Sequence, residues 1–338
     1  MNIVFLVTDA YGGHGGIALF NREFCAAVNE RITVIPRVIR GEVGPIPPHV
    51  TFVADAAKSP LAYLRALAAA RRSKPDLVIC GHMNLLPVAF ERPLLVVHGI
   101  EAWKQRRASL DKCRGIVSVS AITRDRLVGW SGYAGPTYVL PNAVHLEQYG
   151  IRPKRRDLME RFNLDGKRVL LTVGRLDAGE RSKGFDEVLE LLPDLPQDVV
   201  YMIAGGGNDF PRLQQKSVDL GVAARVVFTG LFDERDKPDL YNLADVYVMP
   251  SRGEGFGFVF LEAMACGVPV IGSKADGSRE ALRHGELGLL VDPGNRAELR
   301  VAVLESLARG ERRIPPGLDY FSFDNFAARS RAILSAAR

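Results

Sequence analysis

Short apolar runs alternate along the chain with longer stretches in which apolar residues recur at helical spacing. In the first half, the runs predict strands at 2–8, 32–39, 77–80, 94–97, 116–120 and 137–140. The clearest helical stretches there are 17–29 and 61–72. Continuous Val, Ile and Leu strands separated by helices are typical of a parallel sheet that is covered on both faces.

The pattern pauses after Pro141 and then restarts. A polar stretch rich in Lys and Arg occupies 145–157. Beyond it, strands are predicted at 168–173, 199–204, 225–228, 246–249, 268–272 and 288–291. Two strand–helix series separated by a linker indicate an α/β protein with two Rossmann-like, doubly wound domains. We expect one domain over 1–145, a second over 146–322 and a final segment over 323–338.

Length and composition agree with this division. At about 150 residues per domain, 338 residues correspond to two domains, and a hydrophobic content of 47% excludes disordered and collagen-like chains. No apolar run approaches the roughly 20 residues of a membrane span. The run 2–8 has no basic residues before it and is ended by Asp9, so we do not expect it to be a signal peptide. We expect a cytoplasmic protein that is soluble or, at most, peripheral at the inner face of the membrane.

The cysteines and the usual metal motifs point away from a metal or disulfide protein. Cys25, Cys80, Cys113 and Cys266 are scattered without a CxxC pair, and HExxH and DxD are missing from the sequence. Buried free thiols in a reducing compartment are the simplest interpretation. We therefore predict no metal site.

The positive charge is unevenly distributed. The whole chain has 44 Lys and Arg against 39 Asp and Glu, but residues 1–150 hold 17 against 11. Most of this excess lies in two clusters: Lys58, Arg65, Arg71, Arg72 and Lys74, then Lys104, Arg106, Arg107, Lys112 and Arg114. A basic first half suggests an anionic partner such as a phosphate, a lipid headgroup or nucleic acid. The alternative is a solvated helix face.

We expect the functional residues in the loops that follow the strands, because open parallel sheets bind ligands beyond the carboxyl ends of their strands. The loop 11–16 follows the first strand, and its paired glycines allow close approach of a phosphate to a helix start. Its spacing is neither GxGxxG nor a P-loop, so a tight turn is the alternative. His98 ends another strand, although a lone His is more often structural.

Two cations follow the first strand of the second series. Arg175 and Lys183 lie at a strand end beside a helix start, where they suit a diphosphate, since each offsets charge in a leaving group. Solvated loop charges are the alternative. Gly206 lies in a run of glycines that ends the next strand, where the run permits close backbone approach or simply forms a turn. Leu231 lies at the end of the strand after that, whose backbone could line a base pocket.

The most informative stretch is 254–262. Glu254 lies in a Gly-rich loop, where its carboxylate can accept hydrogen bonds from sugar hydroxyls, and Glu262 lies one turn into the predicted helix 258–266. The N–H groups of Phe258 and Val259 at the start of this helix suit a phosphate. A Glu in an apolar helix is costly unless it is paired or faces a site, so Glu262 suits a ribose diol. The alternative for Glu262 is an ordinary surface position.

Taken in order, these motifs resemble the retaining, nucleotide-sugar-dependent glycosyltransferases of family 4, which have the GT-B fold. The resemblance is strongest over 168–292 and includes the Glu254-x7-Glu262 pattern. The other motifs that carry it are 13–16, His98, Gly174-Arg175, Lys183-Gly184, 204–207, 244–251 and 262–270. The loop 179–182 enlarges the spacing between Arg175 and Lys183 relative to the commonest form of the family.

The resemblance implies a role for each motif. Arg175 and Lys183 would hold the donor diphosphate and stabilise it as the leaving group, and Glu262 would bind the ribose. Glu254 would hold the donor sugar. The remaining donor-binding positions would be Gly15, Gly16, Gly206, Leu231, Gly255, Phe256, Gly257, Phe258 and Val259, and His98 would contact sugar hydroxyls at the reacting carbon.

The resemblance also implies an architecture and a reaction. Two domains would face each other across a cleft, and the helix over 323–338 would return to the first domain. A hexose would pass, with retention, from a UDP- or GDP-linked donor to a saccharide or lipid-linked acceptor in bacterial polysaccharide or lipopolysaccharide synthesis. No further cofactor and no metal is expected, because Arg175 and Lys183 replace the cation. The acceptor would bind the basic first domain, whose cations would also contact an anionic membrane.

Two other classes of function remain open. A dinucleotide-dependent oxidoreductase requires GxGxxG with an acidic residue about 20 positions on, and neither half shows this cleanly. A non-catalytic nucleotide-sugar-binding protein is disfavoured because Arg175, Lys183, Glu254 and Glu262 are all retained. No aromatic-basic module for nucleic acid is visible in the sequence.

Overall fold

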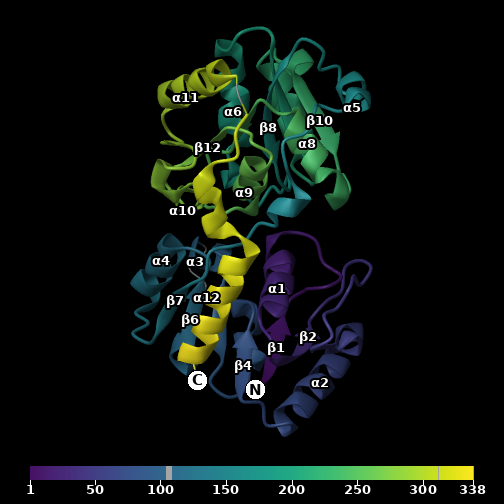
Figure 1. The fold of residues 1–338 in the computed structure, drawn as a ribbon, viewed down its shortest axis with the longest axis vertical. Helices are drawn as coiled ribbons and strands as arrows, with labels where there is room; N and C mark the ends of the chain where they lie inside the picture. Colours follow the sequence, from purple (N-terminus) through teal and green to yellow (C-terminus); the bar gives the residue numbers. More distant parts are fainter. Residues whose placement is uncertain (104–108, 311, 338) are drawn as a thin grey trace. The chain divides into compact units, whose positions relative to one another are not determined.

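The computed structural model describes residues 1–103, 109–310 and 312–337 (Figure 1). The chain forms two compact units. Unit 1 comprises Met1–Ala143 together with Phe321–Arg338, and unit 2 comprises Val144–Tyr320. Both divisions fall two residues before the boundaries expected from the sequence, and the C-terminal segment belongs to unit 1.

Unit 1 is built on a seven-stranded parallel sheet in the order β3-β2-β1-β4-β5-β6-β7. The strands are β1 (Asn2–Val7), β2 (Arg31–Pro36), β3 (Val50–Phe52), β4 (Leu77–Cys80), β5 (Leu94–Val97), β6 (Gly115–Ser118) and β7 (Thr137–Val139). Six of them match predicted runs. The prediction missed β3, because three residues are too few to show a strand period.

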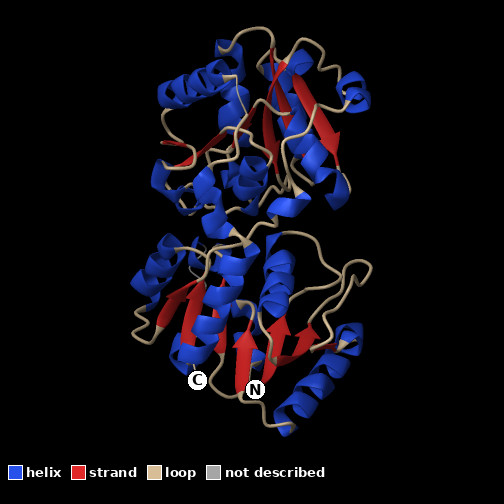
Figure 2. Ribbon diagram, in the orientation of Figure 1, coloured by secondary structure: helices blue, strands red, loops and turns tan. Residues whose placement is uncertain are grey.

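The described helices of unit 1 cover this sheet (Figure 2). They are α1 (Gly16–Ala27), α2 (Pro60–Arg72), α3 (Ile100–Trp103), α4 (Ala121–Ser131) and α12 (Phe323–Ala336). The last helix packs on the first: the rings of Phe20 and Phe326 lie 5.7 Å apart, and Arg331 donates a hydrogen bond to the carbonyl of Ala27. The predicted return of the C-terminal helix to the first domain is therefore confirmed.

Unit 2 contains a six-stranded parallel sheet in the order β10-β9-β8-β11-β12-β13. The strands are β8 (Arg168–Val173), β9 (Val199–Ala204), β10 (Val226–Gly230), β11 (Val246–Val248), β12 (Val270–Ser273) and β13 (Leu289–Val291). In both sheets the first strand of the series is central and the strand order reverses beside it. The predicted pair of Rossmann-like, doubly wound sheets is confirmed.

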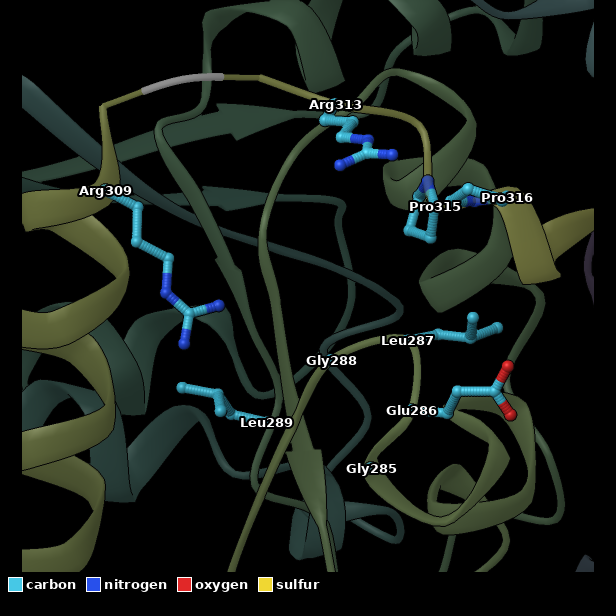
Figure 3. Close-up of a pocket in the computed structure, with 9 residues that line it drawn as sticks. All are labelled: Gly285, Glu286, Leu287, Gly288, Leu289, Arg309, Arg313, Pro315 and Pro316. Carbon is cyan, nitrogen blue, oxygen red and sulfur yellow. The ribbon is translucent and has the colours of Figure 1, made fainter.

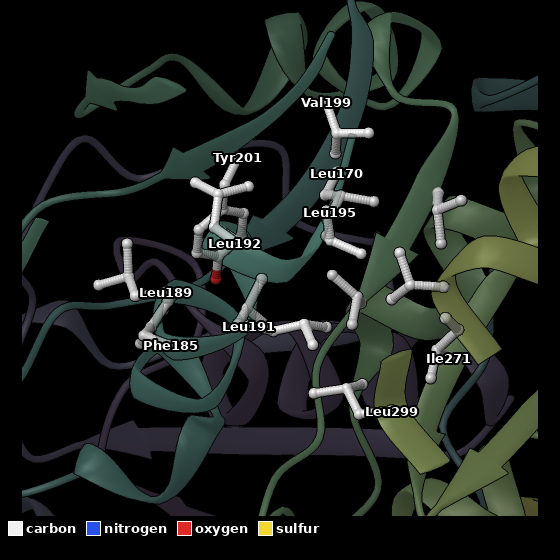
Figure 4. Close-up of a cluster of buried hydrophobic side chains, with 14 of the residues drawn as sticks. Leu170, Phe185, Leu189, Leu191, Leu192, Leu195, Val199, Tyr201, Ile271 and Leu299 are labelled. Carbon is white, nitrogen blue, oxygen red and sulfur yellow. The ribbon is translucent and has the colours of Figure 1, made fainter. Parts of the chain in front are cut away.

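Helices pack on both faces of the second sheet (Figure 2), and Figure 4 shows apolar side chains buried between the sheet and the helices α6 and α11. The described α-helices of unit 2 are α5 (Arg156–Arg161), which has no buried residue, α6 (Phe185–Leu191), α7 (Phe210–Asp219), α8 (Lys237–Leu243), α9 (Phe258–Ala265), α10 (Ser278–Ala281) and α11 (Arg296–Arg309). Leu170 and Ile271 from the strands pack with Leu189 and Leu299 from α6 and α11. This burial on both faces explains why the strands read as continuous apolar runs rather than alternating ones.

Buried polar groups and thiols fit this interior. Tyr201 donates a hydrogen bond to Thr172, which donates to the carbonyl of Val248. All four cysteines are free and buried, as predicted. In the part of the chain that the structure describes, no helix combines the length and the apolar character that a membrane crossing requires.

Candidate functional site

The carboxyl ends of β8 and β11 are adjacent in the second sheet, at the point where the strand order reverses. Arg175 follows β8, and Glu254 follows β11. The loop after β12 also reaches this place, because the N–H of Gly277 donates a 2.9 Å hydrogen bond to the carbonyl of Glu254. Ligands of doubly wound sheets bind at such a reversal point, so this is the candidate site.

Lys183 and Glu254 form the central ion pair of the site. The Lys183 Nζ donates to Glu254 Oε2 at 3.1 Å, and about one-fifth of each side chain is exposed. The charge of Glu254 raises the pKa of Lys183 above its ordinary value, so Lys183 stays protonated through neutral pH. Gly184 makes this placement possible: its φ is +87°, and a Cβ there would lie 2.7–2.9 Å from Pro250.

Asp276 holds the backbone of the Glu254 loop. Its Oδ2 accepts hydrogen bonds from the N–H groups of Gly253 and Glu254 and from the hydroxyl of Ser251. Burial raises the pKa of the Asp276 carboxyl above its ordinary value. Asp276 is not among the predicted site residues. The signal available was an Asp-Gly-Ser turn that begins three residues after the last residue of β12.

Arg175 pairs with a carboxylate of its own loop. Its Nη2 donates to both Glu180 oxygens, at 2.9 and 3.0 Å. Arg175 and Glu180 both contribute to the electrostatic field at Lys183. The structure therefore brings the two predicted cations into one charged cluster, and it adds Glu180, which the sequence analysis did not identify.

Glu262 is only 3% exposed, so the alternative of an ordinary surface position is wrong. Its Oε1 accepts from the Lys237 Nζ at 3.0 Å and its Oε2 from the Tyr241 hydroxyl at 2.6 Å. Burial and the charge of Glu262 raise the pKa of the nearby Tyr149 hydroxyl above its ordinary value. Burial disfavours charged Lys237, but the Glu262 and Glu234 carboxylates outweigh it and raise its pKa. Each oxygen of this buried Glu therefore has one protein donor, which offsets the cost of burying the carboxylate in an apolar helix.

Gly206 and Leu231 lie against each other at the ends of β9 and β10. A Cβ on Gly206 would come within 3.0 Å of the Leu231 side chain. Leu231 is nevertheless 87% exposed, which is unusual for a large apolar residue. The preceding Gly205 must be glycine, because a Cβ there would lie 2.0 Å from the carbonyl oxygen of Gly174. This packing leaves an exposed apolar side chain beside the glycine turn.

The stretch 255–259 forms the start of α9. Gly255, Phe256 and Gly257 are buried, and Gly257 precedes the helix with φ +93° and no side-chain hydrogen-bond cap. Phe258 and Val259 supply the first N–H groups of the helix, which have no partner within a helix. The predicted helix 258–266 ends one residue earlier than expected, at Ala265.

In unit 1, the predicted glycines open α1. Gly15 is the residue before the helix, with φ +91°, and Gly16 is its first residue. No heavy atom lies within 4 Å of a Cβ built on Gly15, so its conformation, rather than a lack of space, favours glycine there.

His98 is held at the end of β5 by its neighbours. Its Nε2 lies 2.9 Å from the carbonyl oxygen of Gly81 and donates to it, and its ring meets Phe20 edge-on at 5.0 Å. Burial lowers the pKa of His98, so the ring is neutral at neutral pH and Nδ1 is an acceptor. The buried Glu101 accepts a hydrogen bond from the His98 N–H and lies 3.5 Å from His82. Neither Glu101 nor His82 is among the predicted site residues.

A hollow of about 460 Å³ lies elsewhere in unit 2 (Figure 3). It is bordered by 285–289, Arg309, Arg313, Pro315 and Pro316. Among the described residues, those of the candidate site do not line it. Within the same described ranges, no cluster of three or more His, Cys, Asp or Glu residues is arranged to hold a metal ion.

Comparison with known families adds an independent observation. Residues 154–314 match the family "Glycosyl transferases group 1". A GDP-mannose-dependent alpha-(1-6)-phosphatidylinositol monomannoside mannosyltransferase of Mycolicibacterium smegmatis is 33% identical over 229 residues, which is 64% of this chain and 59% of that protein. A phosphatidyl-myo-inositol mannosyltransferase of Mycobacterium leprae is 35% identical over 187 residues, 53% of this chain and 47% of that protein. The chain thus spans about half to three-fifths of these relatives.

Solved structures share the complete fold. Anabaena HepE, solved with UDP and glucose, superposes with a TM-score of 0.79 at 21% identity, covering 99% of this chain and 100% of that one. The lipopolysaccharide outer core galactosyltransferase WaaB gives a TM-score of 0.74 at 19% identity, over 99% of this chain and 100% of that one. At these identities the likeness establishes the fold, which is GT-B.

Proposed function

We propose that this chain, whose residues 154–314 match the glycosyl transferases group 1 family, transfers a hexose, with retention, from a nucleotide diphosphate sugar to a saccharide or lipid-linked acceptor. The observation that supports this most strongly is the Lys183–Glu254 pair at the strand-order reversal of unit 2. A lysine that stays charged suits the diphosphate, and a carboxylate suits the hydroxyls of the sugar attached to it.

Each side chain of the cluster then has one task. Arg175 and Lys183 neutralise the negative charge that develops on the departing diphosphate, together with the first N–H groups of α9. Because these cations already supply positive charge, we propose that transfer requires no metal. Glu254 orients the donor sugar, and Asp276 keeps the Glu254 loop in place.

The other predicted residues complete the proposal. Each oxygen of Glu262 accepts one strong hydrogen bond from the protein and has a second lone pair, which suits a ribose hydroxyl. Exposed Leu231 beside Gly206 offers an apolar surface to a base. In unit 1, the N–H groups at Gly15 and Gly16 suit a phosphate, and Nδ1 of neutral His98 suits a sugar hydroxyl.

The donor itself is proposed from the relatives. The mycobacterial relative that is 33% identical is named for GDP-mannose, whereas the more distant HepE was solved with UDP. We therefore propose a GDP- or UDP-linked hexose, with GDP-mannose as the first donor to test. We propose that this transfer is a step of polysaccharide or lipopolysaccharide synthesis.

A nucleotide screen tests the proposed function. We expect GDP or UDP to raise the melting temperature by about 5 °C at roughly a hundred times Kd, and ADP and NAD to have little effect. The shift should persist in EDTA. The nucleotide that binds then identifies the sugar donor for a hydrolysis and transfer assay, in which the anomeric product is followed by NMR. Stabilisation by NAD alone would favour an oxidoreductase, and binding without any turnover would favour a non-catalytic protein.

The surface of α2 supports a membrane-associated acceptor. Leu61 and Leu64 are 56% and 54% exposed, and Arg65, Arg71 and Arg72 are exposed on the same helix. Exposed leucines beside cations are typical of helices that bind anionic membrane surfaces. In the second basic cluster, Arg114 is engaged with the carbonyl of Ala337. Lys104, Arg106 and Arg107 lie outside the described residues. We propose that α2 makes peripheral contact with an anionic membrane.

Sedimentation with lipid vesicles tests this contact. The protein should co-sediment with anionic vesicles at low salt and not with neutral ones, because each cation near the surface contributes about 1 kcal/mol. The double substitution Leu61→Asp with Leu64→Asp should reduce the bound fraction severalfold. Val301→Asp, at a 52% exposed position on α11 of unit 2, is the matched control. Absence of binding to anionic vesicles at low salt would exclude the proposal.

A further inference from the structure

Glu180 lies between the two proposed diphosphate-binding cations along the chain. Both of its carboxylate oxygens accept from Nη2 of Arg175, at 2.9 and 3.0 Å. The Glu180 side chain is only 20% exposed, whereas that of Arg175 is 69% exposed. The carboxylate is therefore the sheltered partner of the pair, and the guanidinium is the partner that a ligand from solvent can reach.

Hydrogen bonds hold this loop in shape. The N–H of Glu180 donates to the carbonyl of Asp177 at 2.8 Å, and the N–H of Gly179 donates to the Asp177 side chain at 2.8 Å. The N–H of Ala178 donates to the Asn208 side chain, also at 2.8 Å. These hydrogen bonds fix the backbone of the turn that carries Glu180. The backbone of this turn therefore loses little conformational entropy when Glu180 pairs with Arg175.

The charge of Glu180 acts on Lys183 as well as on Arg175. Together with Glu254 it contributes to the raised pKa of Lys183. Two carboxylates, Glu180 and Glu254, therefore balance the two cations, Arg175 and Lys183. A nucleoside diphosphate carries about three negative charges near neutral pH. The two cations of the cluster attract these charges, and the two carboxylates repel them.

We propose that Glu180 competes with the diphosphate for Arg175 and thereby weakens retention of the nucleoside diphosphate product. This inference rests on the proposed function. Nη2 of Arg175 already serves Glu180, so a phosphate oxygen that binds the guanidinium either takes that place or binds beside the carboxylate, which remains nearby as a like charge. When Glu180 pairs with Arg175 again, the guanidinium releases the diphosphate. This speeds dissociation of the product, and in an enzyme limited by product release it raises the turnover rate.

Titration calorimetry of Glu180→Gln tests the proposal. The substitution keeps the size and polarity of the side chain and removes its charge. We expect GDP or UDP, whichever the unchanged protein binds, to bind about five to ten times more tightly to the variant. The gain should fall for the monophosphate and vanish for the uncharged nucleoside. Glu180→Ala should give the same order of gain, since it also removes the charge.

Asp198→Asn provides the matched control. Asp198 pairs with Arg168 through two hydrogen bonds at the opposite end of β8, so this variant removes an arginine-bound carboxylate far from the site. It should leave the affinity of every nucleotide unchanged. In steady-state assays, Glu180→Gln should lower the inhibition constant of the diphosphate product by the same five- to tenfold factor, and the control should not.

The outcomes separate this inference from the proposed function. If the unchanged protein binds neither GDP nor UDP at millimolar concentration, the proposed function fails and the inference fails with it. If it binds one of them and both Glu180 variants bind it equally or less tightly, only the inference is overturned. A gain of the same size for nucleoside and diphosphate would also overturn it, because charge competition cannot tighten an uncharged ligand.

Discussion

Lys183→Ala should abolish sugar transfer while leaving the protein folded. We expect kcat/KM to fall by roughly 10²- to 10³-fold, because the substitution removes a fixed positive charge from the position where the departing diphosphate gains negative charge. The affinity for the nucleoside diphosphate should fall as well. Transfer kinetics and calorimetry on the same preparation measure both effects.

The fold should survive this substitution. About one-fifth of the Lys183 side chain is exposed and water can reach Glu254, so the loss of the ion pair should lower the melting temperature by only a few degrees. Lys274→Ala is the control, since Lys274 is an exposed lysine after β12 that pairs with Glu298. Turnover of Lys183→Ala near that of the unchanged protein would contradict the assignment of Lys183.

Glu254→Gln should reduce transfer by a similar 10²- to 10³-fold, for a different reason. The amide keeps the shape of the side chain but gives weaker hydrogen bonds to sugar hydroxyls than a carboxylate does. It also removes a negative charge beside Lys183. We therefore expect the nucleoside diphosphate to bind as tightly as before or slightly more tightly. This separates Glu254 from Lys183, whose loss weakens that same binding.

Two measurements on Glu254→Gln check this expectation. Donor hydrolysis and transfer rates report the loss of activity, and calorimetry with GDP or UDP reports the retained affinity. Glu160→Gln, in an exposed pair with Arg156 on α5, is the matched control and should leave both unchanged. A variant that transfers sugar at the normal rate, or one that loses diphosphate affinity as Lys183→Ala should, would show that Glu254 does not act on the sugar.

Much of the fold was predictable because its information is local. Both sheets are buried on two faces, so their strands read as apolar runs, and 77–80, 94–97, 168–173 and 199–204 match the structure to the residue. The exception, β3, has only three residues and carries no periodic signal. The predicted ends of the other strands indicated where a ligand should bind. The motifs at these ends included Arg175, Lys183, Glu254 and Glu262.

The partners of these residues were not predictable, because they come from distant parts of the chain. Glu254 pairs with Lys183, 71 residues away, and Glu262 pairs with Lys237, 25 residues away. Asp276 lies in an Asp-Gly-Ser turn after a buried strand, but that local pattern does not show that its carboxylate holds the Glu254 loop. Glu180 is close to Arg175 in sequence, but a loop carboxylate normally points to solvent. The hydrogen-bonded turn over 177–180 directs this one to the guanidinium, and the sequence does not show that turn.

The sequence by itself therefore determined that the chain forms two doubly wound sheets, and it identified the strand ends that carry cations, carboxylates and glycines. The tertiary structure decided which of these charges meet. The reason is that hydrophobic periodicity and glycine conformation act over a few residues, whereas an ion pair depends on which strands become neighbours. Strands β8 and β11 are separated in sequence by two others and adjacent in the sheet, and this adjacency places Lys183 beside Glu254.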